Sequence, residues 1–217
     1  DNDCCTYPGA PDGLVLYLNE IHYDNASTDV DEAVEVVATA GLSADELAQI
    51  TLTKYNGGGG VEYGSATLDS FTEGVTVDGL TYYSLLVGSN GLQNGAPDGV
   101  SLSGWGTLYQ FLSYEGTFDA TDGPAMGQTS TDIGASESSS TGSGTSIQYY
   151  GTDGWVSGVT ASLGQVNPIV CFDTTACNYA QVGDCTYANP GFNCNGDALI
   201  NVTFQVNMAE QTVDTEG

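Results

Sequence analysis

The chain has 217 residues, 40% of them hydrophobic, and it carries 28 Asp or Glu residues against a single Lys or Arg, which gives a formal net charge of −27. Nucleic acid and anionic membrane surfaces are therefore poor partners, because both need positive charge at the contact. No apolar run is long enough to cross a bilayer, so we expect no membrane insertion. Such a chain needs salt or bound divalent cations to limit self-repulsion; a simply solvated acidic surface is the alternative interpretation.

The first segment, residues 1–10, is turn-forming throughout and contains the tripeptide Cys5-Thr6-Tyr7. The same tripeptide returns near the other end as Cys185-Thr186-Tyr187, and Pro-Gly follows in both places. A repeated linker that brackets one domain is typical of a tandem array. We interpret residues 1–10 as the tail of a Cys-rich linker.

Residues 11–167 alternate short apolar runs with turns rich in Gly, Asn and Asp. Residues 43–49, with a capping-box pattern at Ser43 and Glu46, are too short for more than one or two helical turns. Short strands at regular spacing predict an all-β protein, an antiparallel β-sandwich. The predicted strands span residues 14–21, 33–39, 50–55, 65–71, 74–77, 81–87, 99–102, 107–114, 146–150 and 154–156.

Residues 110–137 begin as a strand and continue as a loop rich in Gly, Asp, Ser and Thr, interrupted by Gly123-Pro124. We expect a long ordered loop here. Its carboxylates have no cation within the segment to offset them.

Calcium is the cofactor that the acidic segments predict. It takes about six to eight oxygen ligands, which loops supply well, whereas magnesium seldom forms an all-protein cage. The two richest segments, residues 24–32 and 116–132, lack EF-hand spacing, so a site would combine separate loops. The candidate ligands are Glu20, Asp24, Asp29, Asp31, Glu32, Glu115, Asp119, Asp122 and Asp132.

Six cysteines lie near the two ends of the chain: Cys4, Cys5, Cys171, Cys177, Cys185 and Cys194. An even number in Gly-, Asn- and Pro-rich segments indicates disulfide bonds made in an oxidising compartment. Zinc is the alternative, but CxxC pairs are absent and the single histidine is distant in sequence. We therefore expect residues 168–198 to form a small disulfide-rich linker, whose pairing the sequence leaves open.

The last segment, residues 199–217, contains the clearest strand pattern in the chain. Because a lone strand cannot bury its apolar face, it either opens a following module or extends a sheet edge of this or a neighbouring copy. The apolar positions, which alternate with polar ones, are Ile200, Val202, Phe204, Val206 and Met208.

Three stretches carry a resemblance to a known family: residues 18–25 (LNEIHYDN), 32–36 (EAVEV) and 90–99 (NGLQNGAPDG). In this order they resemble the bacterial lamin-tail-type domain, and the resemblance covers about residues 13–167. It implies an immunoglobulin-like β-sandwich from a large secreted bacterial protein. Ala33 departs from the family, which usually has a large aromatic residue at that place.

Shorter resemblances extend beyond the sandwich. Residues 171–197 resemble Cys/Asn/Asp-rich linker repeats of secreted Bacteroidota proteins, and residues 202–208 resemble the first strand of a carbohydrate-binding-like module. Residues 173–175 (DTT) resemble the O-glycosylation signal of that phylum, which implies modification at Thr174. Together these matches imply export to the cell surface or the medium.

Other chemistry is less favoured. His22 would have to serve any Ser–His–Asp arrangement, yet no GxSxG motif accompanies it, and we interpret it as a packing residue. A pair of carboxylates suited to glycoside hydrolysis arises by chance in so acidic a chain. Lys54 either snorkels or pairs with a carboxylate, or forms an isopeptide cross-link. Trp105 and Trp155 belong either to packing or to a sugar-binding face.

The sequence thus predicts no enzyme within this chain. We expect an extracellular structural or adhesive module of a bacterial surface protein or filament, stiffened by disulfides and calcium, with neighbouring copies or adjacent modules as partners. The alternative is a carbohydrate- or protein-binding accessory module of a larger secreted enzyme.

Overall fold

The structure is a computed structural model that describes residues 9–199. Three predicted features lie outside the described residues: Cys4 and Cys5, the first eight residues of the predicted linker tail, and the predicted strand at Ile200–Met208. Within the described part, contacts divide the chain into one compact unit up to Ile169 and a second unit from Val170 onward.

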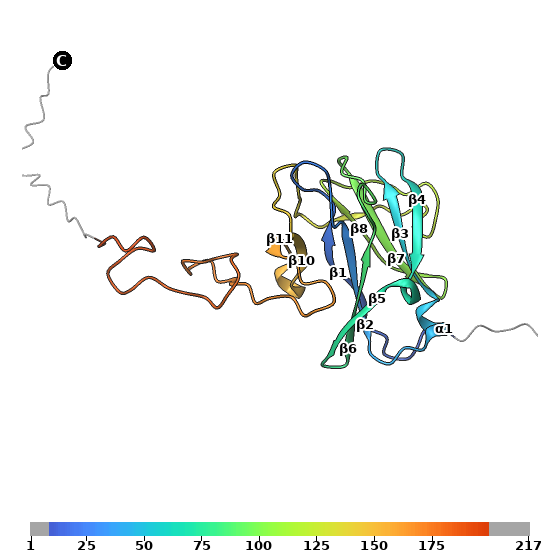
Figure 1. Ribbon diagram of the computed structural model, residues 1–217, viewed down its shortest axis with the longest axis horizontal. Helices are drawn as coiled ribbons and strands as arrows, with labels where there is room; N and C mark the ends of the chain where they lie inside the picture. Colours follow the sequence, from blue (N-terminus) through green and yellow to red (C-terminus); the bar gives the residue numbers. More distant parts are fainter. Residues whose placement is uncertain (1–8, 200–217) are drawn as a thin grey trace, which may run out of the picture. The chain divides into compact units, whose positions relative to one another are not determined.

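Two β-sheets pack face to face in the first unit, as the sequence predicts (Figure 1). The first sheet has the strand order β11-β10-β1-β2-β6-β5, and its pairs are antiparallel. Its strands are β1 (Leu16–His22), β2 (Ala33–Thr39), β5 (Thr72–Val77), β6 (Leu80–Leu86), β10 (Thr145–Tyr149) and β11 (Trp155–Thr160).

The second sheet has the order β4-β3-β7-β8-β9 and is antiparallel apart from the short parallel pair β8·β9. Its strands are β3 (Ile50–Asn56), β4 (Val61–Thr67), β7 (Asp98–Gly104), β8 (Thr107–Tyr114) and β9 (Thr131–Asp132). Helical structure is confined to α1 (Ala44–Leu47) and the 3₁₀ turns η1 (Leu68–Ser70) and η2 (Gly151–Asp153) within the described residues. The all-β sandwich predicted from strand spacing is confirmed.

Two local predictions have different outcomes. The capping box before α1 is present, because the Ser43 side chain accepts from the Glu46 backbone and the Glu46 side chain accepts in return. The strand predicted at residues 65–71 is wrong: β4 begins earlier, at Val61, and ends at Thr67. Leu68 then turns into the core through η1, so an apolar residue that looks like part of the strand belongs to a turn.

The space between the sheets is filled by aliphatic and aromatic side chains at alternate positions, as the two-residue period of a strand requires. On β2 the inward positions are Val34, Val36 and Ala38, and they meet Leu52 and Leu102 from the second sheet in one buried cluster. Burial of this cluster supplies the main driving force for folding.

The long loop that follows β8 covers the outer face of the second sheet. Phe118, Ala120 and Ala125 from the loop pack on Tyr55 and Phe111 and form a second, smaller buried cluster. The Phe111 and Phe118 rings meet edge to face with centroids 5.2 Å apart. The ordered loop predicted at residues 110–137 is therefore held by its own apolar side chains.

A second covering segment, residues 161–165, lies over the outer face of the first sheet. The Val75 N–H of β5 donates to the Gly164 carbonyl at 2.9 Å. Gly164 has a positive φ of 74°, and a Cβ at Gly74 would collide with its carbonyl oxygen, so the close approach requires glycine at Gly74. Beneath this segment lie the side chains of Glu20 and Glu35, both with 0% exposure.

The second unit has almost no regular structure and is held by two disulfide bonds, Cys171–Cys185 and Cys177–Cys194. The two bonds overlap along the sequence: Cys177 lies within the loop that Cys171–Cys185 closes, and Cys185 lies within the loop that Cys177–Cys194 closes. The prediction that the four cysteines of this segment form disulfides is confirmed. Bonds of this kind are typical of an oxidising, extracellular environment.

Candidate functional site

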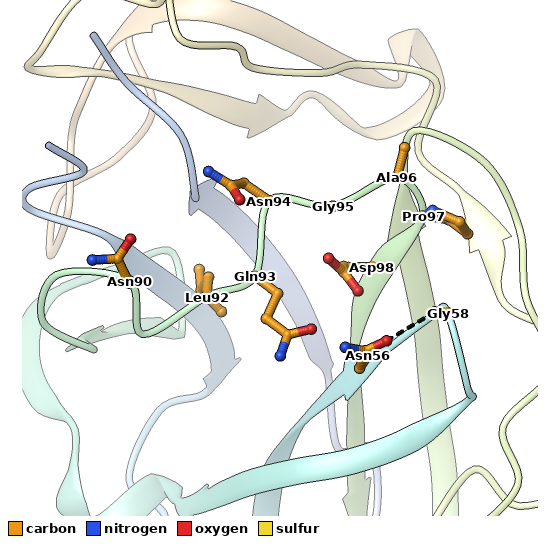
Figure 2. A pocket seen from close by; sticks show the side chains of 10 residues that line it. All are labelled: Asn56, Gly58, Asn90, Leu92, Gln93, Asn94, Gly95, Ala96, Pro97 and Asp98. Atoms are coloured by element: carbon orange, nitrogen blue, oxygen red, sulfur yellow. Dashed lines mark hydrogen bonds between the residues drawn. The ribbon is translucent and has the colours of Figure 1, made fainter. Parts of the chain in front are cut away.

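A polar pocket of about 370 Å³ lies at the start of β7, beside the turn between β3 and β4. Most of its wall is the loop of residues 90–97, which includes a cis peptide bond between Ala96 and Pro97. Figure 2 shows the carboxylate of Asp98 and the side-chain amides of Asn56 and Gln93 facing the same space.

Asp98 anchors the pocket. It is buried, with 2% exposure, and its Oδ1 accepts from the Gly57 N–H at 2.9 Å. Burial raises the pKa of Asp98, while the N–H groups of Gly57 and Gly95 oppose the shift and the nearby Glu115 charge adds to it. Asp98 therefore fixes both loops that line the pocket.

The amide side chains present hydrogen-bond donors and acceptors at the pocket wall. Asn56 Oδ1 accepts from the Gly58 N–H at 2.9 Å, which leaves its amide NH₂ toward the cavity. Asn94 Nδ2 donates to Asp29 Oδ2 at 3.1 Å and so ties the pocket loop to the acidic segment after β1. Leu92 and Pro97 provide the apolar part of the wall.

The end of β1, next to this loop, holds a buried ion pair. His22 Nδ1 lies 2.8 Å from Glu137 Oε1, and the two side chains are 5% and 0% exposed. Burial lowers the pKa of His22, but the hydrogen bond and charge of Glu137 outweigh it, so the net pKa is raised. Glu137 Oε2 also accepts from the backbone N–H groups of Tyr23 and Asp24, at 2.6 and 3.1 Å.

Both nitrogens of the His22 ring are occupied. Asn25 Nδ2 donates to the Val30 carbonyl at 2.7 Å, which sets the orientation of the amide, and the same Nδ2 lies 2.9 Å from His22 Nε2. In the neutral ring Nε2 therefore accepts, and the proton is on Nδ1, facing Glu137. This arrangement suits a structural histidine that orders the chain after β1.

Stacked tyrosines connect the ion pair to the pocket. The rings of Tyr23 and Tyr114 stack with centroids 3.8 Å apart. Tyr23 Oη donates to Glu115 Oε1 at 3.1 Å, and the Glu137 N–H donates to Tyr23 Oη at 2.8 Å. Tyr114 Oη donates to the carbonyl of Gln93, a pocket residue, at 2.6 Å. The pocket loop and the loop that contains Glu137 are thus fixed to the same aromatic pair.

Glu32 holds the beginning of the pocket loop from inside. It is 0% exposed, and its Oε2 accepts from the backbone N–H groups of Gly91 and Leu92. Burial raises the pKa of Glu32, and those two N–H groups oppose the shift. Its Oε1 has no hydrogen-bond partner among the described residues, and neither does Asn25 Oδ1.

Within the described residues 9–199, no three His, Cys, Asp or Glu side chains are arranged to hold a metal ion. The predicted ligands Glu20 and Glu32 instead accept backbone N–H groups of Ser162 and of the pocket loop. Among the predicted ligands, Asp29 and Glu115 lie near enough to Asp24 for their charges to act on it. Burial raises the pKa of Asp24, and the charges of Asp29, Glu137 and Glu115 raise it further.

The remaining predicted ligands lie in turns. Asp122 Oδ1 accepts from the Glu62 N–H at 2.7 Å, and Asp119 Oδ1 accepts from the Thr129 hydroxyl. Asp132 Oδ1 accepts from the Gly134 N–H at 2.9 Å within its own turn. Asp31 is exposed with a left-handed φ of 58°. These carboxylates stabilise loop geometry and do not converge on one point.

Lys54 is half-buried on the inward side of β3. Its Nζ donates to the Gly91 carbonyl at 2.8 Å and lies 5.0 Å from the centre of the Tyr63 ring. Burial lowers the pKa of Lys54, and the charge of Glu32 opposes this. The lysine thus donates to a backbone carbonyl of the pocket loop, whereas the sequence favours snorkelling or a carboxylate partner.

Both tryptophans pack against other apolar side chains. Trp105 packs against the main core, and Trp155 packs against both the core and the Tyr149 ring at 5.2 Å. Tyr17 meets Tyr149 edge to face at 5.9 Å, so Tyr17, Tyr149 and Trp155 form a row of ring contacts. Neither tryptophan lines the amide pocket.

In the second unit Thr174 is exposed, beside Asp173, whose Oδ1 accepts from the Thr175 N–H at 2.8 Å. Tyr187 Oη donates to Asp173 Oδ2 at 2.8 Å, which fixes this turn near the Cys171–Cys185 bond. Glycosylation of Thr174 stays a prediction.

Comparison of the chain with known protein families, with curated proteins and with solved structures finds no match. No helix in residues 9–199 has the length and apolar character needed to span a membrane.

Several of the buried carboxylates that hold the loops were missed by the sequence analysis. Asp98 and Glu137 look like ordinary members of acidic turns, and Glu35 looks like an isolated acid within a strand. Glu35 could have been noticed, because an acidic residue between Val34 and Val36 in a strand indicates that this face of the sheet is either exposed or covered by another segment. The sequence does not show which, because the covering segment, residues 161–165, is distant along the chain.

Proposed function

We propose that this chain is a non-enzymatic structural or adhesive module of a secreted bacterial surface protein or extracellular filament. Neighbouring copies or adjacent modules are its partners in this proposal, and Ile200–Met208 is the segment that links them. The lamin-tail-type family and the Bacteroidota source, which rest on the sequence resemblance, belong to the same proposal.

The observation that carries the proposal is that hydrogen bonds to buried side chains hold the loops in place. Buried carboxylates hold loop N–H groups at three places: Glu35 holds Gly164, Glu32 holds Leu92, and Glu137 holds Tyr23. Two disulfides hold the segment that follows. Loops tied from inside suit a module that must keep its shape outside the cell, whereas lids and gates need segments of low local stability.

The test is the assembly of the full chain. Sedimentation velocity over a range of concentrations, with electron microscopy, should show oligomers or filaments. Val202→Asp combined with Phe204→Asp should abolish them, because the charges fall on the apolar side of the alternating segment. Asn201→Asp with Thr203→Asp adds the same charge to the polar side and should leave assembly intact. A wild-type chain that is monomeric at every concentration would remove the filament function.

A role for calcium is part of the proposal. It is supported by the end of β1, where the charges of two predicted ligands, Asp29 and Glu115, act on a third, Asp24. Ca²⁺ accepts such oxygen ligands from separate loops. Coordination of the ion by these carboxylates would further stabilise the loops at the end of β1.

Carbohydrate binding is the second candidate function, and the amide pocket favours it. Primary amides offer a donor and an acceptor each, which suits the hydroxyl groups of a neutral sugar, while the surrounding carboxylates disfavour an anionic ligand. A glycan array with the full chain tests it. Asn90→Ala and Gln93→Ala should abolish any binding without unfolding, since no hydrogen bond of either side chain within the described residues holds the fold. Binding by a monomeric chain would favour this accessory-module function over the filament.

A further inference from the structure

The edge strand β4 leaves an open groove between the two sheets. Gly64 and Ala66 of β4 pair with Lys54 and Leu52 of β3, so they occupy the inward positions of the edge strand. Both are among the smallest residues. The groove has a volume of about 230 Å³, and its apolar walls include Leu85 from β6 of the opposite sheet and Val87, which follows that strand. A core position filled by Gly and Ala at an edge leaves space for a side chain from elsewhere.

The same side of the sandwich also has unpaired backbone. β4 is the edge of its sheet, so one row of its N–H and C=O groups has no strand partner in the ladder. At the start of the strand the Glu62 N–H already donates to Asp122 Oδ1, so the free edge is the part that follows. In the other sheet, β5 pairs with β6 only between Leu80 and Ser84, so Leu85 and Leu86 extend beyond it. Leu86 is 66% exposed. An apolar groove beside a free strand edge is the arrangement to which an extended segment adds as an extra strand.

The chemistry of the groove selects one occupant. An acidic segment is disfavoured on a chain of net charge −27, and residues 200–208 (INVTFQVNM) carry no charge. Every second residue of this segment is apolar, which matches a strand that presents one side to a groove and the other to water. Nine residues also suffice to run along the seven residues of β4.

Charge also favours one orientation of the incoming segment in the groove. Lys54, the single Lys or Arg of the chain, lines the groove. The segment after residue 208 contains Glu210, Asp214 and Glu216, so a chain that passes the groove brings carboxylates near the one cation available. Opposite charges at such a contact favour one orientation over its reverse.

We propose that the groove between β4 and the end of β6 receives residues Ile200–Met208 of a second copy, which add as a strand along β4 and place alternate apolar side chains over Gly64 and Ala66. This acceptor site rests on the proposed linking function and specifies where the link is made. The open edge of β4 is then covered in the assembly, and its unpaired backbone groups gain partners.

Photo-cross-linking of the full chain tests the site. A photoreactive p-benzoylphenylalanine replaces Phe204, and copies labelled with ¹⁵N are mixed with unlabelled ones so that mass spectrometry identifies links between copies. The expected links fall on Val61–Thr67 and residues 85–87. Oligomers whose links fall on another edge, such as β11, would overturn the acceptor site and leave the linking function standing. A chain that never associates would overturn both.

Filling the groove gives an independent measurement. Ala66→Phe should weaken association by about tenfold or more, because its ring occupies the space that the incoming side chain needs. Val77→Phe places the same ring at the β5 edge, where Val77 is exposed, and should leave association unchanged. Thermal unfolding of both variants verifies that they fold. Wild-type association by folded Ala66→Phe would contradict the proposal.

Discussion

Glu20 and Glu35 lie opposite each other in the neighbouring strands β1 and β2, and both side chains are completely buried under residues 161–165. Two carboxylates in such a position are normally balanced by cations, yet the chain has only one Lys or Arg, and that residue contacts a different loop. Hydrogen bonds take the place of a counter-charge: Glu20 accepts from Ser162 N and Oγ, and Glu35 accepts from Asn19 and Gly164.

The pair makes stability depend on pH. Burial raises the pKa of Glu35 from 4.5 to about 7, while hydrogen bonds from Asn19 and Gly164 oppose the shift and the charge of Glu20 adds to it. Because the folded state holds its proton more tightly than the unfolded state, the free energy of unfolding falls as pH rises from about 4.5 to about 7. The loss attributable to Glu35 is at most about 3 kcal/mol.

Glu35→Gln, which cannot ionise, should flatten this part of the pH profile. Urea unfolding between pH 4.5 and 8 measures it, with Glu73→Gln, an exposed acid on β5, as the control. Equal pH slopes for wild type and Glu35→Gln would show that Glu35 titrates normally.

Removal of Glu137 should destabilise the sandwich strongly. Glu137→Ala leaves the buried His22 ring and the N–H groups of Tyr23 and Asp24 without their acceptor, at a cost of about 3 kcal/mol or more. Glu137→Gln keeps the size and an acceptor oxygen, so its loss should be smaller. Urea unfolding at pH 7 measures both, and Ser138→Ala in the same loop is the control. A change below about 0.5 kcal/mol in Glu137→Ala would mean that the ion pair does not hold this end together.

Reduction of the disulfides should act on the second unit and spare the first. Closing loops of this length stabilises by about 3 kcal/mol each, and this unit has few other contacts. After mild reduction, chymotrypsin should cut rapidly at the exposed Tyr179, Tyr187 and Phe192. The thermal midpoint of the sandwich should stay within about 2 °C, since its core contains no disulfide among the described residues. Simultaneous melting of both parts would contradict this division.

Calcium should raise the thermal midpoint if the carboxylates after β1 bind it. A ligand that binds only the folded state stabilises in proportion to its affinity and concentration. Scanning calorimetry with CaCl₂, with EDTA, and with NaCl at equal ionic strength separates a specific site from charge screening. Asp24→Asn should remove the calcium-dependent part, whereas Asp69→Asn, an exposed acid in η1, should not. No difference between CaCl₂ and NaCl would remove calcium from the account.

The strand pattern of the sequence was sufficient for the fold, because alternation and turn residues are local signals. Strands β2 and β8 fall where apolar residues such as Val34 and Phe111 predict them. The site was harder to predict, because its members come from distant segments. Acid-rich loops predicted metal ligands, but Glu20 and Glu32 hold backbone N–H groups from residues far along the chain, which no local pattern reveals.

Amide hydrogen exchange tests most directly whether buried carboxylates fasten the loops. The N–H groups that they hold, at Tyr23, Asp24, Leu92, Ser162 and Gly164, should be protected about as strongly as the central strands β1 and β2. The neighbouring exposed Ser139, whose N–H has no hydrogen-bond acceptor among the described residues, provides the unprotected reference. Exchange of those loop amides at the rate of Ser139, while the strands stay protected, would show that the loops open freely and would contradict the account.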